Sequence, residues 1–270
     1  MRIGITGATG FIGRHVASAA RGHGHKVVAY SRRQGEGTLQ QPPDAPHALP
    51  ETPLDALVHL AGESLMGLWT KEKRHRIWTS RVDFTEKLVA HLATWKPENR
   101  PKVFVCASGI GYYGDSGSTP VDESTPRGSG FLADVCEGWE NAARQAEALG
   151  MRVVLLRTSM VLGKDGGAFP LLRRVFNLGL GGRLGSGEQW MSWIHLDDEA
   201  GLILKAIETE GLTGPINLAA PNPVTNAEFT RQLAATLHRP AFFHVPAFAL
   251  RLLLRDMANE MLLGGQRGVP

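Results

Sequence analysis

Short apolar runs alternate with helical patterns through the first part of the chain. Runs typical of buried strands cover 3–6, 25–30, 54–62, 102–108 and 152–162. Helical periodicity fills the intervals, most clearly around Val16, over 82–92 and over 131–149. A weaker strand is expected within the Gly-, Pro- and Gln-rich stretch 35–53. Because strand and helix alternate, residues 1–162 are predicted to form an α/β domain with a doubly wound parallel sheet.

The pattern becomes less regular after residue 162. Residues 163–187 are dense in glycine, and shorter elements follow. Helices are predicted over 200–209 and 223–237, a short strand over 215–219, and a partly helical apolar segment over 242–263. We therefore expect a smaller substrate-side lobe over 163–270.

Three glycines mark the turn after the first strand. Gly7, Gly10 and Gly13 stand at three-residue spacing between an apolar strand and a helix. A strand, a glycine turn and a helix form the geometry that holds a pyrophosphate at a helix N-terminus, because a Cβ there would keep backbone N–H groups from the phosphate oxygens. The context predicts a dinucleotide site, against the alternative of a plain glycine-rich turn.

The end of the second strand indicates which dinucleotide binds. NAD-specific folds place an acidic residue about 20 positions after the glycine turn to bind the ribose 2′-hydroxyl. This chain has Ser31, Arg32 and Arg33 there. A guanidinium pairs with a 2′-phosphate, whereas a carboxylate repels it, so the segment favours NADP(H). The alternative is that both arginines are solvated loop residues.

Composition narrows the classes of protein to which the chain can belong. The 270 residues are 43% hydrophobic and 20% charged, with a net charge of +3, which fits a globular protein and gives no basic run typical of nucleic-acid binding. Cys106 and Cys136 form no disulfide framework or metal spacing, so we expect no metal. With no signal peptide and no apolar run of roughly 18 residues, we expect a cytoplasmic protein with no membrane partner. The sequence leaves open whether two copies of the chain form a homodimer.

Candidate catalytic hydroxyls follow the central strand 102–108. Ser108 ends that strand, and Tyr112 and Tyr113 lie a few residues further on. Hydroxyls at the carboxyl end of a central parallel strand are placed to lie over a nicotinamide. The alternative is structural, with Ser108 satisfying a backbone group and the tyrosines packing.

A second cluster lies beside the glycine-dense loop. Trp190, Trp193 and His195 are predicted to form a substrate wall or lid. An equally supported alternative is a small tryptophan core in which Asp197 or Asp198 caps the following helix.

These residues together resemble a known family, the atypical extended short-chain dehydrogenase/reductases called epimerase family proteins, which are similar to sugar-nucleotide epimerases and carry a C-terminal domain of unknown function. The resemblance spans essentially the whole chain. The segments that carry it are 6–13, 31–32, 60–63, 80–82, 111–114, 179–182, 193–195, 223–229 and 265–267.

The resemblance implies a Rossmann-type fold, NADP(H) as cofactor and a set of cofactor contacts. It places Gly7, Gly10, Phe11 and Ile12 at the pyrophosphate, and Ser31 and Arg32 at the 2′-phosphate. It adds further cofactor contacts, which are Leu60, Ala61, Arg81 and Val161.

Two departures from the family pattern affect the expected activity. Active members of the wider superfamily carry a Tyr-x-x-x-Lys pair on the helix after Gly130, in which the tyrosine supplies the proton. Aligned on Glu140, the pair falls at Leu132 and Cys136, so the usual acid–base groups are missing. Family members also generally continue beyond 265–267, so we expect only part of the small C-terminal domain.

Two functions therefore remain. The first is an NADP(H)-dependent oxidoreductase or epimerase with an unknown carbonyl or sugar-nucleotide-like substrate, and with Ser108, Tyr112 or Tyr113 as the nearest proton donors. Cys136 is a weaker candidate for that role. The second is a non-catalytic NADP(H)-binding sensor or regulator.

Overall fold

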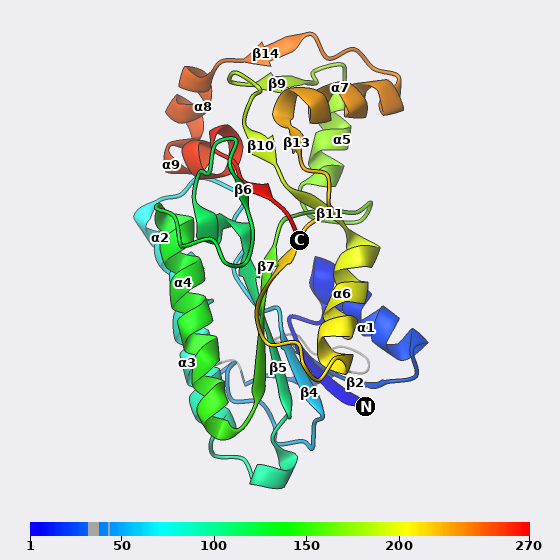
Figure 1. Cartoon of the computed structure of the whole chain (residues 1–270), viewed down its shortest axis with the longest axis vertical. Coiled ribbons are helices and arrows are strands. Elements are labelled where there is room, and N and C mark those ends of the chain that lie inside the picture. Colours follow the sequence, from blue (N-terminus) through cyan, green and yellow to red (C-terminus); the bar gives the residue numbers. More distant parts are fainter. Residues whose placement is uncertain (32–37, 43) are drawn as a thin grey trace.

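The computed structural model describes residues 1–31, 38–42 and 44–270, which form two parts (Figure 1). The lower part in this view is a sheet covered by helices, and the upper part is a smaller lobe of short strands and helices. Seven parallel strands make the sheet, in the order β12-β7-β5-β4-β1-β2-β3. They are β1 (Arg2–Thr6), β2 (Lys26–Ser31), β3 (Thr38–Gln40), β4 (Ala56–His59), β5 (Val103–Gly109), β7 (Arg152–Thr158) and β12 (Gly214–Leu218).

Helices cover both faces of this sheet. On one face, α1 (Phe11–Gly22) packs beside α6 (Leu196–Glu208), and the apolar cluster beneath them includes Ile3, Ile5 and Val16. On the other face lie α3 (Val82–Leu92) and α4 (Phe131–Arg144), above a cluster that includes Phe104. The predicted doubly wound parallel sheet is therefore confirmed, and the chain reverses its winding between β1 and β4.

The lobe is built from two-stranded pairings and short helices. The pairs are β8 (Met160–Leu162) with β11 (Trp193–His195), β10 (Trp190–Met191) with β13 (Val224–Thr225), β9 (Gly182–Leu184) with β14 (Phe243–Val245), and β6 (Pro120–Val121) with β15 (Arg267–Gly268). The helices are α5 (Phe169–Asn177), α7 (Asn226–Leu237), α8 (Ala247–Leu254) and α9 (Asp256–Ala258). α7 begins at Asn226, three residues after the predicted start of the helix, because Thr225 caps it by accepting a hydrogen bond from the Glu228 N–H.

The sheet continues past the expected domain boundary at residue 162. α6 and β12 both follow that position, yet β12 pairs with β7 along its length, from Gly214 opposite Val154 to Leu218 opposite Thr158. The chain thus leaves the sheet after β7, builds part of the lobe, and returns to add the last strand. As a division into folding units, the boundary at 162 stays a prediction.

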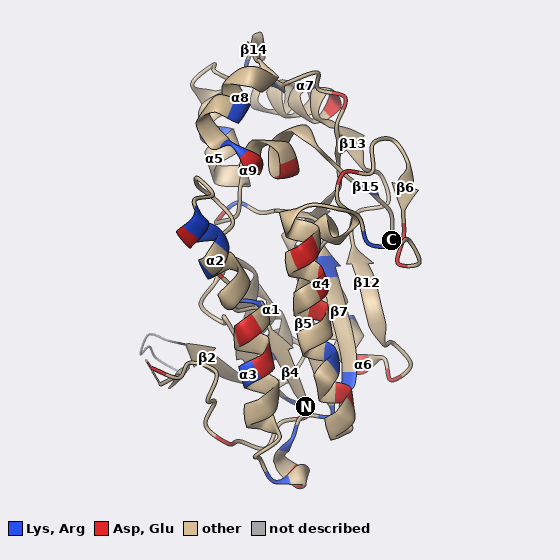
Figure 2. Ribbon diagram, turned by 90° about the vertical axis from the view of Figure 1, so that its left-hand side faces the viewer, with Lys and Arg blue, Asp and Glu red and all other residues tan. Residues whose placement is uncertain are grey.

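Contacts of α2 (Lys71–Thr79) and α4 join the lobe to the sheet domain. Arg74 on α2, a helix whose Lys and Arg positions are blue on the ribbon in Figure 2, donates to Asp256 Oδ2 at 2.7 Å. Glu260 accepts hydrogen bonds from the N–H groups of Phe131 and Leu132, at 2.9 and 2.7 Å. A buried apolar cluster that includes Trp69, Ile77, Val135 and Met257 lies between the same elements. The Glu260 carboxylate therefore caps α4 from 129 residues away.

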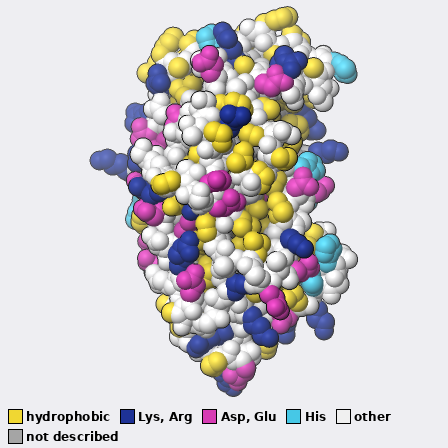
Figure 3. Space-filling view, in the orientation of Figure 1, with side chains coloured by type: hydrophobic (Ala, Val, Ile, Leu, Met, Phe, Trp, Pro, Cys, Tyr) yellow, Lys and Arg dark blue, Asp and Glu magenta, His cyan; other side chains and the backbone are white. Residues whose placement is uncertain are grey.

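Charge is spread evenly over the face shown in Figure 3, where basic and acidic side chains alternate and hydrophobic side chains gather around the junction of the two parts. Within the described residues, none of the helices is long and apolar enough to cross a membrane.

Substituting Glu260→Gln should destabilise the fold. The amide keeps one acceptor oxygen instead of two and has no charge to oppose the positive end of α4, so we expect a loss of about 1 kcal/mol. Urea unfolding measures it, with Glu188→Gln, an exposed loop carboxylate, as the matched control. Equal unfolding midpoints for the two variants would contradict the capping role.

Candidate functional site

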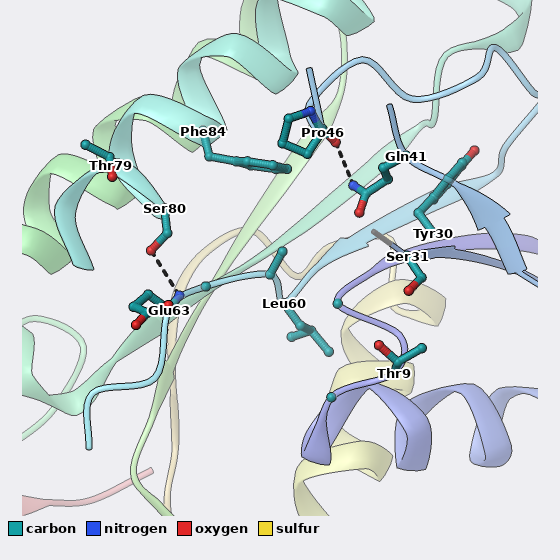
Figure 4. A pocket seen from close by; sticks show the side chains of 14 residues that line it. Thr9, Tyr30, Ser31, Gln41, Pro46, Leu60, Glu63, Thr79, Ser80 and Phe84 are labelled. Atoms are coloured by element: carbon teal, nitrogen blue, oxygen red, sulfur yellow. Dashed lines mark hydrogen bonds between the residues drawn. The ribbon is translucent and has the colours of Figure 1, made fainter. Parts of the chain in front are cut away.

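A cleft of about 670 Å³ opens at the carboxyl ends of β1, β2 and β4 (Figure 4). This is the end of a parallel sheet, and the reversal point in strand order, at which doubly wound folds bind ligands. The lining residues come from four segments: Gly7, Thr9 and Gly10; Tyr30, Ser31, Gln41 and Pro46; Leu60, Ala61, Gly62 and Glu63; Thr79, Ser80 and Phe84.

The glycine turn forms the floor of this cleft. Gly7 has a φ of +71°, and its carbonyl accepts a hydrogen bond from the Gly10 N–H at 2.9 Å. A Cβ on Gly13 would lie 2.2 Å from the Gly7 oxygen, so no larger residue fits there. Gly10 is the N-cap of α1 and offers no side-chain cap, and the first turn of the helix holds no acidic residue. The backbone N–H groups of the first turn form the positive end of α1, which points toward the cleft and suits a phosphate.

Phe11 and Ile12 contribute to this turn through their backbone. Both side chains pack against the apolar cluster under α1. The Phe11 ring is also enclosed by the loop 163–167, where a Cβ on Gly166 would lie 2.4 Å from the ring. Arg14 holds the same loop by donating to the Asp165 carbonyl at 2.7 Å. The glycine turn and the first loop of the lobe therefore form one packed unit.

The predicted contacts after β4 also reach the cleft. Leu60 and Ala61 line it, and the Leu60 N–H donates to the Thr6 carbonyl at 3.2 Å. The Arg81 guanidinium lies 5.1 Å from the Trp139 ring. It also packs closely enough on Gly62 that a Cβ on that glycine would lie 3.2 Å from its Cζ. Burial lowers the pKa of Arg81, although Cys136 and Glu63 oppose this shift. Arg81 is thus a partly desolvated cation beside the cleft wall.

A buried histidine lies beneath the cleft and joins β1 to α3. His59 Nδ1 is 2.6 Å from Thr6 Oγ1, and its Nε2 is 3.0 Å from Thr85 Oγ1, which donates to the Arg81 carbonyl. Because Thr85 uses its proton on that carbonyl, Thr6 donates to Nδ1 and the Nε2–H donates to Thr85. Burial, reinforced by Arg81, lowers the pKa of His59 to about 3, so the ring is neutral. It positions the wall and does not titrate near neutrality.

The end of β2 carries a hydroxyl and no carboxylate. Ser31 lines the cleft and is 5% exposed. Arg32 and Arg33 lie outside the described residues. Glu63 is the acidic residue among those that line the described cleft, and Figure 4 places it across the cleft from Ser31. Its carboxylate accepts a hydrogen bond from Lys73 Nζ at 2.7 Å. Val161, the remaining predicted contact, is buried in β8 opposite Ile194.

Two of the three predicted catalytic residues, Ser108 and Tyr113, belong to a buried polar network. Ser108 Oγ donates to Glu140 Oε1 at 2.8 Å. Arg157 donates to both Glu140 oxygens at 2.9 Å, and its Nη1 donates to the Tyr113 hydroxyl at 2.9 Å. The Tyr113 hydroxyl in turn donates to Asn217 Oδ1 at 2.8 Å. The network joins β5, α4, β7 and β12 through continuous hydrogen bonds.

This network sets the acidity of its members. Burial alone lowers the pKa of Arg157, but its hydrogen bonds to Glu140 and Tyr113 outweigh that effect and raise the pKa above its usual value. Burial raises the pKa of Tyr113, even though Arg157 acts in the other direction. Tyr113 is therefore a weaker acid than free tyrosine. Tyr112 differs, because it is partly exposed and its ring lies 3.5 Å from Arg157 Cζ.

Leu132 and Cys136 occupy the places of the missing Tyr-x-x-x-Lys pair. The Leu132 side chain packs on Gly111, and Cys136 Sγ lies close to Gly109. Burial, followed by the charge of Glu140, raises the pKa of Cys136 to about 11. The thiol is therefore protonated at neutral pH and is a poor acid–base group.

The tryptophan cluster contacts the C-terminal segment. The Arg267 guanidinium lies 4.4 Å from the Trp190 ring, and Trp193 Nε1 donates to the Asn222 carbonyl at 3.2 Å. None of Trp190, Trp193 and His195 lines the described cleft, so their role as a substrate wall stays a prediction. The alternative in which Asp197 or Asp198 caps α6 is wrong on this point, because His195 caps the helix by accepting a hydrogen bond from the Asp197 N–H at 3.3 Å.

Sequence reasoning missed the outer wall of the cleft. Gln41 is buried and donates to the Pro46 carbonyl at 2.7 Å, and both face Phe84 across the opening (Figure 4). The irregular stretch 35–53 has no periodicity that would reveal this. It also missed Glu199 on α6, which is fully buried and accepts a hydrogen bond from Thr158 at 2.9 Å. Burial raises the pKa of Glu199 to about 8, and its Oε2 has no hydrogen-bond partner.

Comparisons with known proteins agree with this geometry. The model of the NAD dependent epimerase/dehydratase family matches residues 3–219. An epimerase family protein of Mycobacterium leprae is 40% identical over 278 aligned residues, which are 99% of this chain and 88% of the relative.

Two solved structures extend the comparison. The crystal structure of human epimerase family protein SDR39U1 (isoform 2) with NADPH has 35% identity and a TM-score of 0.92, and the match covers 100% of this chain and 91% of that one. The nucleoside-diphosphate sugar epimerase from Corynebacterium glutamicum has 33% identity and a TM-score of 0.79. In that case the match covers 100% of this chain and 53% of the other.

Substituting Glu199→Gln should change how stability depends on pH. The pKa of Glu199 is about 8 in the folded state, against an ordinary 4.5, so its contribution to stability is complete below pH 4.5 and is lost as pH rises toward 8. Between pH 5 and 7.5 the wild type should lose up to about 1.4 kcal/mol per pH unit relative to the variant.

Urea unfolding of both proteins at pH 5, 6, 7 and 8 measures this difference. His59 contributes a slope of opposite sign, since its lowered pKa makes stability fall as pH drops below 6.5, but that slope is common to both proteins. Parallel stability curves would show that Glu199 is ionised in the folded state.

Proposed function

The chain belongs to the NAD dependent epimerase/dehydratase family, among the epimerase family proteins that include SDR39U1, and we propose that it binds NADP(H) in the cleft at the ends of β1, β2 and β4. The observation that carries this proposal is a glycine turn that opens onto a cleft whose β2 end holds Ser31 and no carboxylate. The NADPH in the human SDR39U1 structure supports the same cofactor.

The chain's own residues would hold the cofactor as follows. The backbone N–H groups of Phe11, Ile12 and Gly13 at the start of α1 would donate hydrogen bonds to the pyrophosphate. Ser31, together with the neighbouring Arg32 of the sequence, binds the 2′-phosphate. Tyr30 and Gln41 bound the cleft beyond β2, and Leu60 and Ala61 bound it after β4.

We further propose that the protein is an oxidoreductase or epimerase for a small carbonyl or sugar-nucleotide-like substrate. When bound, NADP(H) supplies hydride transfer, and the chain must then supply or accept a proton. Ser108 and Tyr113 already direct their protons to Glu140 and Asn217. Tyr112 is the candidate donor whose hydroxyl has no protein acceptor among the described contacts, and Arg157 lies over its ring. We therefore assign the proton to Tyr112 first and expect slow turnover.

A specific observation supports the second function. Leu132 and Cys136 replace the usual pair, and the buried network leaves no lysine beside either tyrosine within the described residues. A protein that binds NADP(H) and reports its redox state without turnover needs only the cleft and the packed loop at Phe11.

The proposed compartment is the cytoplasm and the proposed partner is a small molecule. Cys106 and Cys136 are free and buried, as expected of a protein in a reducing compartment. Burial raises the pKa of both thiols, so neither is reactive.

NADPH should bind more tightly than NADH, and Ser31→Asp should remove the preference. A carboxylate at the end of β2 repels the 2′-phosphate, so NADPH affinity should fall by at least about tenfold, the equivalent of losing one charge-assisted contact. NADH affinity should hold or rise. Titration by tryptophan fluorescence gives both constants, with Ser118→Asp, the same change at an exposed serine outside the lining of the cleft, as control. Equal affinity of the wild type for both cofactors would refute the proposed site.

Tyr112→Phe should slow single-turnover NADPH oxidation by about 100-fold, the contribution typical of a general acid. Ser108→Ala should slow it less, because that hydroxyl acts through Glu140. Cys136→Ala should leave the rate unchanged, since its thiol is buried and protonated. A carbonyl panel screened by NADPH absorbance supplies the substrate. Cofactor binding with no oxidation by any carbonyl would favour the sensor.

A further inference from the structure

Three metal-ligating side chains meet at the end of the sheet opposite the cleft. His23 and His25 flank the turn between α1 and β2, and Glu208 lies in the last turn of α6. His25 Nε2 is 3.0 Å from Glu208 Oε1, and His23 Nδ1 is 3.9 Å from the same oxygen. All three ligand atoms lie within 4.8 Å of one another. The proposed cofactor site uses the other end of α1, so this cluster is separate from it.

The backbone holds this cluster in place. The N–H groups of His23, Gly24 and His25 donate to the Ala19, Arg21 and Ala20 carbonyls, at 3.0, 3.0 and 2.9 Å. The last turn of α6 is fixed as well, because Arg152 donates to the carbonyls of Ala206 and Ile207.

Exposure differs among the ligands. The His25 side chain is only 12% exposed, whereas those of His23 and Glu208 are 59% and 40% exposed. His25 is thus fixed, whereas His23 and Glu208 can move toward it by rotating their side chains.

We propose that His23, His25 and Glu208 bind a divalent transition-metal ion, with zinc as the best match. Two imidazoles and one carboxylate form a ligand set that suits zinc, whose fourth position is then open to water. Zinc ligands at about 2.0–2.2 Å from the metal lie a little over 3 Å apart, so His23 must move by about 1 Å. Magnesium and calcium prefer oxygen ligands and do not fit this set.

The bound metal would tie the α1–β2 turn to α6. α1 and α6 pack side by side on one face of the sheet, and the glycine turn lies at the other end of α1. Because the metal binds the folded arrangement of all three ligands, it stabilises that arrangement by mass action.

The experiment uses the full chain without a polyhistidine tag. Isothermal titration with zinc chloride at pH 7.5 should show one equivalent bound. Cobalt(II) should give the visible absorption of a four-coordinate site. Magnesium chloride should give no binding.

The variants His23→Ala and Glu208→Gln should each weaken zinc binding by at least about tenfold, since even the loss of a supporting group around a metal costs that much. Both residues are exposed enough for the chain to fold without them. His75→Ala, an exposed histidine on α2, is the matched control and should bind like the wild type. Equal affinity in all four proteins, or no cobalt absorption in the wild type, would overturn the proposal.

Discussion

The buried ion pair between Arg157 and Glu140 constrains the centre of this protein. Both side chains are 4% exposed, and they share two hydrogen bonds of 2.9 Å. Charges removed from water are tolerated only when their remaining lone pairs and protons are satisfied, and removing one partner of such a pair typically costs about 3–5 kcal/mol. Ser108 meets this requirement by donating a hydrogen bond to Glu140, and Tyr113 meets it by accepting one from Arg157. Their hydroxyls are therefore fixed by the stability of the fold before any ligand binds.

Because of this constraint, cofactor binding in the cleft and proton transfer by the network hydroxyls depend on different residues. The cleft is formed by backbone at the glycine turn and by segments after β2 and β4, which the ion pair does not touch. The network also reaches the lobe, because Asn217 donates to the Val269 carbonyl at 2.9 Å. The same residues that hold α4 against β7 thus hold the C-terminal segment in place. Hydroxyls with this structural duty are poorly suited to move protons, whereas a cofactor can still bind.

The sequence predicted the parts of the molecule that depend on neighbouring residues. Strand, glycine turn and helix lie within about a dozen residues, so the turn at Gly7 could be located, and the family resemblance is confirmed by the relatives. Contacts between distant segments were out of reach. Glu260 caps a helix that begins 129 residues earlier, and Glu140 meets Ser108 only because α4 packs on β5. The wall at Gln41 belongs to an irregular segment whose path follows from tertiary packing.

The enclosure of Phe11 by the loop 163–167 has a thermodynamic consequence. The ring belongs to the first residue of α1, whose backbone faces the phosphate position, and the loop leads directly into the lobe. Because the Phe11 ring fills the space between the turn and the loop, the free energies of the two segments are linked. Such a linkage has the same size in both directions, so whatever stabilises the turn against the loop stabilises the loop against the turn equally.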